Sequence, residues 1–247
     1  MIRELTSLEQ LRSATGDDPL LVWTAQGLQG GARAWALGDA VVSSAFGISR
    51  ADAMGVRGDP EDLALLVRHA LAELGPTFRP LGERALVREV VNRMPELRLV
   101  AAGFTWRTLD KAPATDEPDL AWLPAARDPE VAALLEEHAP GSFAQPGAPG
   151  VRRWAGLVSG GRLAAVGADA WSAPGCGLLS SVATVSDLRG RRLAERLCRW
   201  VSARFIEEYG RAALMVYDAN APAVRLYDRL GYSAMPMAAS EVVPAGS

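Results

Sequence analysis

The residues best suited to chemistry lie at 182–194, where the chain reads V-A-T-V-S-D-L-R-G-R-R-L-A. There an apolar strand leads through a polar turn and an Arg-Gly-Arg-Arg loop into a long amphipathic helix. The first N–H groups of a helix lack intrahelical partners, and with the helix dipole they bind anions such as a diphosphate. Gly190 lets a phosphate approach the backbone, and Arg189, Arg191 and Arg192 add positive charge. The alternative interpretation is an ordinary strand–turn–helix with a solvated basic turn.

A second segment with chemical potential is residues 220–232, which read N-A-P-A-V-R-L-Y-D-R-L-G-Y. Asn220 suits the N-cap of a short helix, and Gly231 stands where a left-handed glycine ends one. Tyr227 lies well inside this helix, and an apolar strand at 212–217 precedes it. We therefore expect a phosphate-type loop, a strand and a capped helix with an internal tyrosine, in that order.

In this order, the two segments resemble the GNAT superfamily of acyl-CoA-dependent N-acyltransferases. Arg189 and Ala194 match the ends of the family's first motif, Arg/Gln-x-x-Gly-x-Gly/Ala, whose central glycine is replaced by Arg192. The second motif, Asn-x-x-Ala-x-x-Leu-Tyr with Leu-Gly-Phe/Tyr, is matched by Asn220, Ala223, Leu226, Tyr227, Leu230, Gly231 and Tyr232. The resemblance covers residues 118–240 and looks closest to the glycine N-acyltransferase-like branch. The departure at Arg192 bears on the affinity for the cofactor more than on its identity.

The resemblance implies an α/β fold with a mixed sheet that transfers an acetyl group from acetyl-CoA, or another acyl group, to a primary amine of a small molecule or peptide. Tyr227 is implied as the general acid that protonates the departing thiolate, the alternative being a packed aromatic ring. Asn220 is implied as a cofactor contact besides its role as a cap. The remaining implied cofactor-binding residues are Val182, Ala183 and Thr184 on the strand, and Arg189, Gly190, Arg191, Arg192, Leu193 and Ala194 in the loop.

The sequence does not single out a general base, because the central strand offers hydroxyls but no carboxylate. The candidates by reach are Glu136, Glu137, His138 and Asp218. A water relay, or an amine that arrives already neutral, would need none of them. The alternative function, from a different class, is a non-catalytic acyl-CoA-binding regulatory or sensing protein, which would release no free CoA when amines are added.

Composition limits the other classes of function. The 247 residues are 49% hydrophobic and carry a net charge of −3, so nucleic-acid binding, which needs a basic face, is not expected. No apolar run is long enough to span a bilayer and no leader is evident, so we expect no membrane and a cytoplasmic location. Cys176 and Cys198 form neither a metal spacing nor a disulfide framework, so no metal is expected and Cys198 is taken as a packed thiol.

A Pro-rich, charged connector at 109–118 predicts two domains, 1–112 and 113–247. In the first, we expect strands at 32–37 and 40–45, helices at 60–74 and 83–94, and a strand at 97–104. This order echoes the second half, so the first is interpreted as a degenerate GNAT-like or substrate-shaping domain. It lacks the Asn/Tyr motif, and Asp59 stands where a diphosphate would lie, so no second acyl-CoA site is expected.

In the second half, we expect strands at 120–123, 152–158, 163–171 and 177–185, with a helix at 129–138. Residues 139–150 are too rich in Pro and Gly for regular structure, and Phe143 there is either a substrate contact or part of a loose loop. In the long helix, Leu193, Leu197, Val201 and Phe205 follow at i+4 steps and should face the core, with Trp200 on the same face. The residues expected outside that face are Arg192, Glu195, Arg196 and Arg199.

Overall fold

All twelve strands join one mixed sheet in the computed structural model, which describes residues 1–49 and 51–243. The strand order is β1-β2-β3-β4-β5-β12-β6-β11-β10-β9-β8-β7. The first half holds β1 (Arg3–Glu4), α1 (Leu8–Thr15), α2 (Pro19–Thr24), β2 (Arg33–Leu37), β3 (Ala40–Ile48), β4 (Ala51–Arg57), α3 (Pro60–Leu74), β5 (Phe78–Glu83), α4 (Arg84–Arg93) and β6 (Leu97–Leu109). The second holds β7 (Leu120–Trp122), α5 (Asp128–His138), β8 (Val151–Ser159), β9 (Arg162–Ala170), β10 (Gly177–Thr184), α6 (Leu193–Tyr209), β11 (Ala212–Tyr217), α7 (Ala221–Arg229) and β12 (Ser233–Val242).

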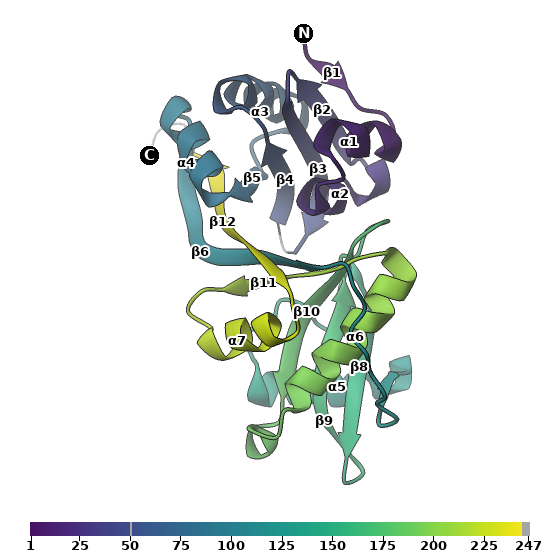
Figure 1. The fold of residues 1–247 in the computed structure, drawn as a ribbon. Helices are drawn as coiled ribbons and strands as arrows, with labels where there is room; N and C mark the ends of the chain where they lie inside the picture. Colours follow the sequence, from purple (N-terminus) through teal and green to yellow (C-terminus); the bar gives the residue numbers. More distant parts are fainter. Residues whose placement is uncertain (50, 244–247) are drawn as a thin grey trace.

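The two halves repeat one topology. From one edge of the sheet, β1 to β5 follow one another in sequence order, and from the other edge β7 to β11 do the same. In each half the fourth and fifth strands are parallel, β4 with β5 and β10 with β11. A helix connects each parallel pair, α3 in the first half and α6 in the second. Figure 1 shows the halves one above the other, with α6 and α7 beside the lower sheet. The echo between the halves therefore extends to the order of the strands and to the helix that joins each parallel pair.

The last strand of each half is exchanged into the other half. β12 pairs antiparallel with β5, and β6 pairs antiparallel with β11, while β6 and β12 also pair with each other. In Figure 1 these two long strands cross between the halves. β6, a strand from the first half, therefore pairs with the strands of the second half and extends their part of the sheet.

Several elements were absent from the sequence-based expectation: β1, α1, α2, β4, β5 and β12. The expected strand–strand–helix–helix–strand order of the first half was thus incomplete, and β6 runs to Leu109 rather than ending at Phe104. β12 contains Pro236 and several small residues, so its local propensity for a strand is weak. It is a strand because it has hydrogen-bonded neighbours on both sides.

The apolar face of α6 packs on the sheet as expected, with Leu197, Val201 and Phe205 fully buried. Glu195 corrects the expectation, because it is also buried rather than outside the packed face. Its carboxylate accepts a hydrogen bond from Arg229 Nε at 3.0 Å, at the end of α7. An apolar repeat of 3.6 residues identifies the face of a helix that packs on the core. It cannot show that a neighbouring helix will also cover a charged residue outside that face.

Candidate functional site

The parallel strands β10 and β11 separate soon after they start. They pair only at Gly177 with Ala212 and at Leu178 with Ala213. On the other side of β10, the register with β9 shifts between Ser180 and Ala183. This bulge turns β10 away from β11, so the backbone of residues 179–184 on that side has no strand partner in the described sheet. Such an edge can bind an extended, amide-bearing ligand.

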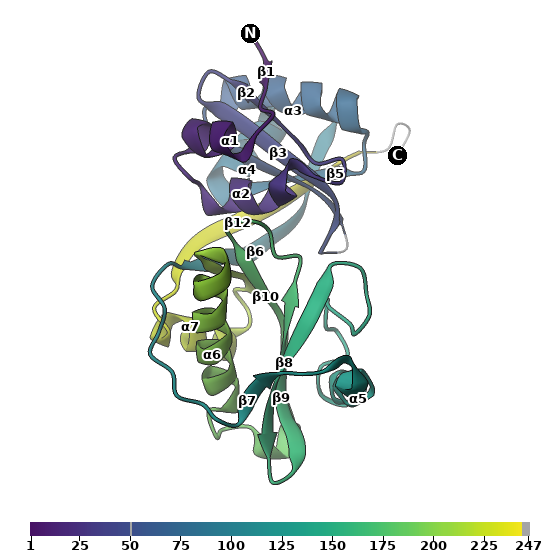
Figure 2. The same cartoon turned by 90° about the vertical axis from the view of Figure 1, so that its right-hand side faces the viewer.

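A groove of about 570 Å³ occupies the gap between these strands. In Figure 2, α6 and α7 lie to the left of the lower sheet and α5 lies to its right. A groove of this size suits a ligand of cofactor dimensions. The predicted site residues that line it are Val182, Ala183, Thr184, Arg189, Ala194, Asn220 and Tyr227.

The other predicted cofactor residues do not line the groove. Gly190, Arg191 and Arg192 are exposed in the loop at its end, and the side chain of Leu193 is packed in the core. Arg192 is the N-cap of α6, with a left-handed backbone at φ 59°, and no side chain caps the helix. The first N–H groups of α6 are therefore left without a capping group, as an anion site requires.

Positive charge in this loop is not neutralised locally. Among the described ion pairs, none joins Arg189, Arg191 or Arg192 to a carboxylate, and Arg189 donates instead to the carbonyl oxygen of His138 at 3.1 Å. Asp187, the one acid in the loop, accepts from Arg162 at 2.5 Å. The start of α6 thus combines open N–H groups with guanidinium groups available to a phosphate.

The wall of the groove carries an unpartnered polar atom. Thr184 Oγ1 is buried and has no hydrogen-bond partner among the described residues. Buried hydroxyls are normally hydrogen-bonded, so an isolated one in a groove wall suits a polar ligand group. The residues present therefore fit the amide-bearing arm of an acyl-CoA.

The helix α7 places Asn220 and Tyr227 on the groove. Asn220 caps the helix, as expected, by accepting from the N–H of Ala223 at 3.3 Å. Tyr227 is only 7% exposed, and its ring packs against that of Tyr232 at a centroid distance of 5.7 Å. Burial raises the pKa of Tyr227 well above its usual value of 10.0, with a further contribution from the neighbouring thiol of Cys198. The phenol is therefore held protonated, as a proton donor must be.

The cysteines are packed thiols, as expected for Cys198. Both Cys176 and Cys198 are buried, and burial raises the pKa of each thiol to about 12. A thiol with so high a pKa is almost entirely protonated at neutral pH and is therefore a poor nucleophile.

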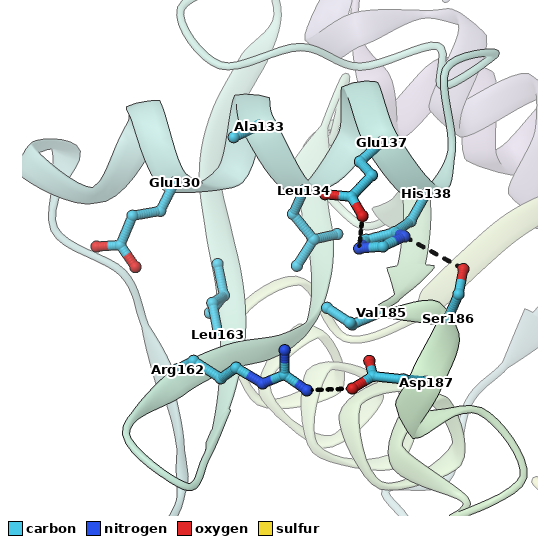
Figure 3. A pocket seen from close by; sticks show the side chains of 10 residues that line it. All are labelled: Glu130, Ala133, Leu134, Glu137, His138, Arg162, Leu163, Val185, Ser186 and Asp187. Carbon is cyan, nitrogen blue, oxygen red and sulfur yellow. Dashed lines mark hydrogen bonds and ion pairs between the residues drawn. The ribbon is translucent and has the colours of Figure 1, made fainter.

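Of the four candidate bases, only His138 lines the groove. Its ring also lines a second pocket of about 510 Å³ beneath α5, shown in Figure 3. In that pocket Nδ1 lies 3.2 Å from Ser186 Oγ and Nε2 lies 3.6 Å from a Glu137 carboxylate oxygen. Both ring nitrogens thus already face other groups (Figure 3).

The remaining acidic candidates are outside the groove or occupied. Asp218 follows Tyr217, which lines the groove, but its carboxylate accepts from Arg84 at 2.8 Å. Glu136 and Glu137 are exposed on α5 and do not line the groove. No described residue therefore presents an unoccupied carboxylate to the gap between the strands.

Sequence reasoning missed the groove residues that come from the first half. Ser49 follows β3, and Ala101 and Phe104 belong to the exchanged strand β6. The ring of Phe104 lies 6.4 Å from that of Tyr217, at the end of β11. No local pattern marks these residues, and strand exchange brings Ala101 and Phe104 to the groove. Phe143, by contrast, was a candidate and does line it.

The corresponding place in the first half is closed. β4 and β5 stay paired from Asp52 to Gly55, and a Cβ built on Gly82 would lie 2.8 Å from the Val56 carbonyl oxygen. The start of α3 is capped by Asp59, whose carboxylate accepts from the N–H groups of Glu61 and Asp62. This half thus has neither separated strands nor an open helix start.

Comparisons with known proteins agree with this geometry. Residues 155–241 match the family model for FR47-like proteins. A GNAT-family protein from Novosphingobium aromaticivorans is similar over 91% of this chain and 98% of its own, with 23% identity and a TM-score of 0.57. The fold is that of the GNAT acetyltransferases. A GCN5-related N-acetyltransferase from Kribbella flavida gives 19% identity and a TM-score of 0.57, over 92% of this chain and 96% of its own. No curated protein matches the sequence.

Two further features concern membranes and metals. No helix among residues 1–49 and 51–243 is long and apolar enough to cross a membrane. Nor do three or more His, Cys, Asp or Glu side chains gather as a metal site within that part of the chain.

Proposed function

We propose that the chain is an acyl-CoA-dependent N-acyltransferase that moves an acetyl group from acetyl-CoA to a primary amine of a small molecule or peptide. The observation that carries this proposal is the separation of β10 and β11, which forms a groove ending at the uncapped, arginine-flanked start of α6. The order of the two sequence motifs supports the same conclusion and favours the glycine N-acyltransferase-like branch.

In this proposal, the described residues have distinct roles. The loop from Arg189 to Ala194 holds the diphosphate, and the edge of Val182 to Thr184 holds the pantetheine arm and polarises the thioester oxygen. The amine nitrogen bonds to the acyl carbon as the carbon–sulfur bond breaks, and the nitrogen loses its extra proton to water. Tyr227 gives its proton to the departing sulfur and is reprotonated from solvent. Acyl-CoA supplies the activated acyl group.

A substitution at Gly190 tests the placement of the diphosphate. Gly190 has φ +80°, and a Cβ built there meets nothing within 4 Å, so Gly190→Val adds bulk in open space and strains the backbone. We expect calorimetry to show at least about tenfold weaker CoA binding. Gly210→Val is the matched control, because Gly210 has φ +86° and equally open surroundings at the far end of α6.

Equal CoA affinity in wild-type protein and Gly190→Val, with both folded, would contradict this placement. A sensing protein, the alternative, would bind CoA normally but release none from acetyl-CoA when amines are added. Proton donation by Tyr227 would serve the enzyme and not a sensor, so the turnover of Tyr227→Phe also bears on this choice.

A further inference from the structure

The groove has an apolar end that the cofactor residues leave open. Its lining includes Ala101 and Phe104 from β6 and Phe143 from the loop after α5. Tyr217 extends this wall, since its ring packs edge-on to Phe104 and remains 55% exposed. The backbone N–H of Ala144 donates to Ser181 Oγ at 2.8 Å, which fixes the loop against the bulge of β10. This end is built to receive an aromatic or large apolar group beside the bulge.

The same end of the groove has no carboxylate among its described lining residues to bind a cation. The titratable side chains lining the groove are His138, Arg189, Tyr217 and Tyr227, and no described lining residue is Asp or Glu. The carboxylate of Asp218, the residue after Tyr217, is paired with Arg84. An ammonium ion entering this groove would lose its water and gain no opposite charge, which disfavours the charged form of an amine.

An amine must be neutral to attack, and the described residues supply no unoccupied base to deprotonate it. An alkylamine with a pKa of about 10.4 is neutral to about one part in a thousand near pH 7.4, whereas a peptide α-amino group with a pKa of about 7.8 is neutral to about three parts in ten. A site without a base therefore selects amines that are already neutral in solution.

We propose that the acceptor is a weakly basic primary amine, the α-amino group of a peptide or amino-acid amide, next to an aromatic or large apolar side chain. The inference rests on the proposed function and names its substrate class. The aromatic group packs against Phe104 and Tyr217, and the amine reaches the bulge of β10 already neutral. The first half of the chain thus shapes specificity through β6.

Four amines test the two parts of this proposal separately, namely the weak basicity of the amine and the aromatic group next to it. Phenylalanine amide has both properties, 2-phenylethylamine keeps the ring but is strongly basic, glycine amide keeps the weak base without the ring, and spermidine is a polycation. With acetyl-CoA at neutral pH, we expect phenylalanine amide to release CoA at least about tenfold faster than 2-phenylethylamine, despite the greater intrinsic nucleophilicity of the latter. Glycine amide should show a KM at least about tenfold higher, since it buries no ring.

Binding gives a readout that does not depend on turnover. Calorimetry should show phenylalanine amide, but not spermidine, binding to the protein saturated with free CoA. Tyr217→Ala should weaken this binding and raise the KM for phenylalanine amide about tenfold without changing that for glycine amide. Leu65→Ala is the control, because Leu65 is 51% exposed on α3, outside the groove, and Tyr217 is 55% exposed. Asp218→Asn should leave the rate with phenylalanine amide unchanged.

Several results would overturn the inference while leaving the proposed function intact. These are faster transfer to 2-phenylethylamine or spermidine, no transfer to phenylalanine amide by a protein that binds CoA, or a rate loss of about 100-fold in Asp218→Asn, which would make Asp218 the base. Failure of wild-type protein to bind CoA would instead contradict the proposed function itself.

Discussion

Tyr227 is the side chain on which the proposed proton transfer depends. Tyr227→Phe keeps the buried ring and removes only the hydroxyl, so folding and CoA affinity should barely change. If the phenol donates its proton to the thiolate, turnover should fall by about 10²-fold or more. Because burial raises the pKa of Tyr227 well above 10.0, its ionisation should not reduce the rate at any lower pH. Rates at saturating acceptor, under conditions where chemistry limits turnover, measure this.

Tyr232→Phe is the matched control for that substitution. Tyr232 is also buried, and its hydroxyl lies 2.6 Å from Ser202 Oγ, but it does not line the groove. We expect a loss of about 1 kcal/mol in the free energy of unfolding and an unchanged rate. Equal turnover in Tyr227→Phe and wild-type protein would make Tyr227 a core residue only.

Arg192 stands where the motif that the sequence resembles has its central glycine, and its backbone adopts a conformation that favours glycine. Its φ of 59° is left-handed, which costs a residue with a Cβ about 1–2 kcal/mol. Glycine removes that strain but gives the unfolded chain more freedom, worth about 0.4–1 kcal/mol. Arg192→Gly should therefore stabilise the protein by about 0.5–1 kcal/mol in denaturant unfolding.

Arg191→Gly is the comparison for this change, since Arg191 is not among the residues with positive φ. It should lower the free energy of unfolding slightly, while both variants lose one positive charge. Destabilisation by Arg192→Gly would show that the left-handed backbone is not strained. A matched loss of CoA affinity in both variants would assign their guanidinium groups to the diphosphate.

At the scale of elements, the position of α7 depends on a buried charge in the exchanged strand. Arg107 on β6 is almost fully buried, and it donates to Asp228 on α7 at 2.6 Å. Asp228→Ala leaves the buried guanidinium without its carboxylate and should cost about 2 kcal/mol of unfolding free energy. Arg107→Met removes the buried charge itself and should cost less, about 1 kcal/mol.

The order of these two losses is the test, measured by chemical denaturation. Glu207→Ala is a matched control, because Arg204 and Glu207 are also 2.6 Å apart and the Glu207 side chain is 56% exposed, like that of Asp228. With a half-exposed arginine as partner, its loss should be at most about 1 kcal/mol. A smaller loss for Asp228→Ala than for Arg107→Met would mean that water already solvates Arg107.

Elements with a strong local pattern were predictable from the sequence, and those made by distant pairing were not. The helix α3 follows from its Asp59 cap and its apolar period, α6 follows from its apolar period, and the Asn220 cap of α7 was predicted from its residue type. The exchange of β6 and β12 has no local signature, because the backbone N–H and C=O groups of either strand could form hydrogen bonds with any neighbouring strand of suitable register. Of the loop and strand residues predicted to contact the cofactor, Val182 to Thr184, Arg189 and Ala194 line the groove and Gly190 to Leu193 do not, while Ser49, Ala101 and Phe104 were missed.

At the scale of the whole molecule, one topology is used twice with different results. The two halves share strand order and one pair of parallel strands each, but only the second pair separates. The bulge at Ser181, with φ 51°, turns β10 away from β11, whereas β4 stays against β5 next to Gly82. The first half instead contributes β6 as a wall of the second half's groove. We propose that it is a degenerate GNAT-like domain that shapes the acceptor site.

This asymmetry predicts the stoichiometry of cofactor binding. In the first half, β4 and β5 stay paired, and the first N–H groups of α3 already bond to the Asp59 carboxylate. A diphosphate at this helix start would have to displace that carboxylate and would be repelled by its negative charge. Calorimetric titration should therefore saturate at about one CoA per chain. Asp59→Ser keeps a capping oxygen and removes the charge, and it should still bind one CoA, because the β4–β5 pairing continues to exclude the pantetheine arm. Saturation at two CoA per chain in wild-type protein would contradict the closed first half. A second site gained only in Asp59→Ser would show that charge, rather than strand pairing, keeps that half empty.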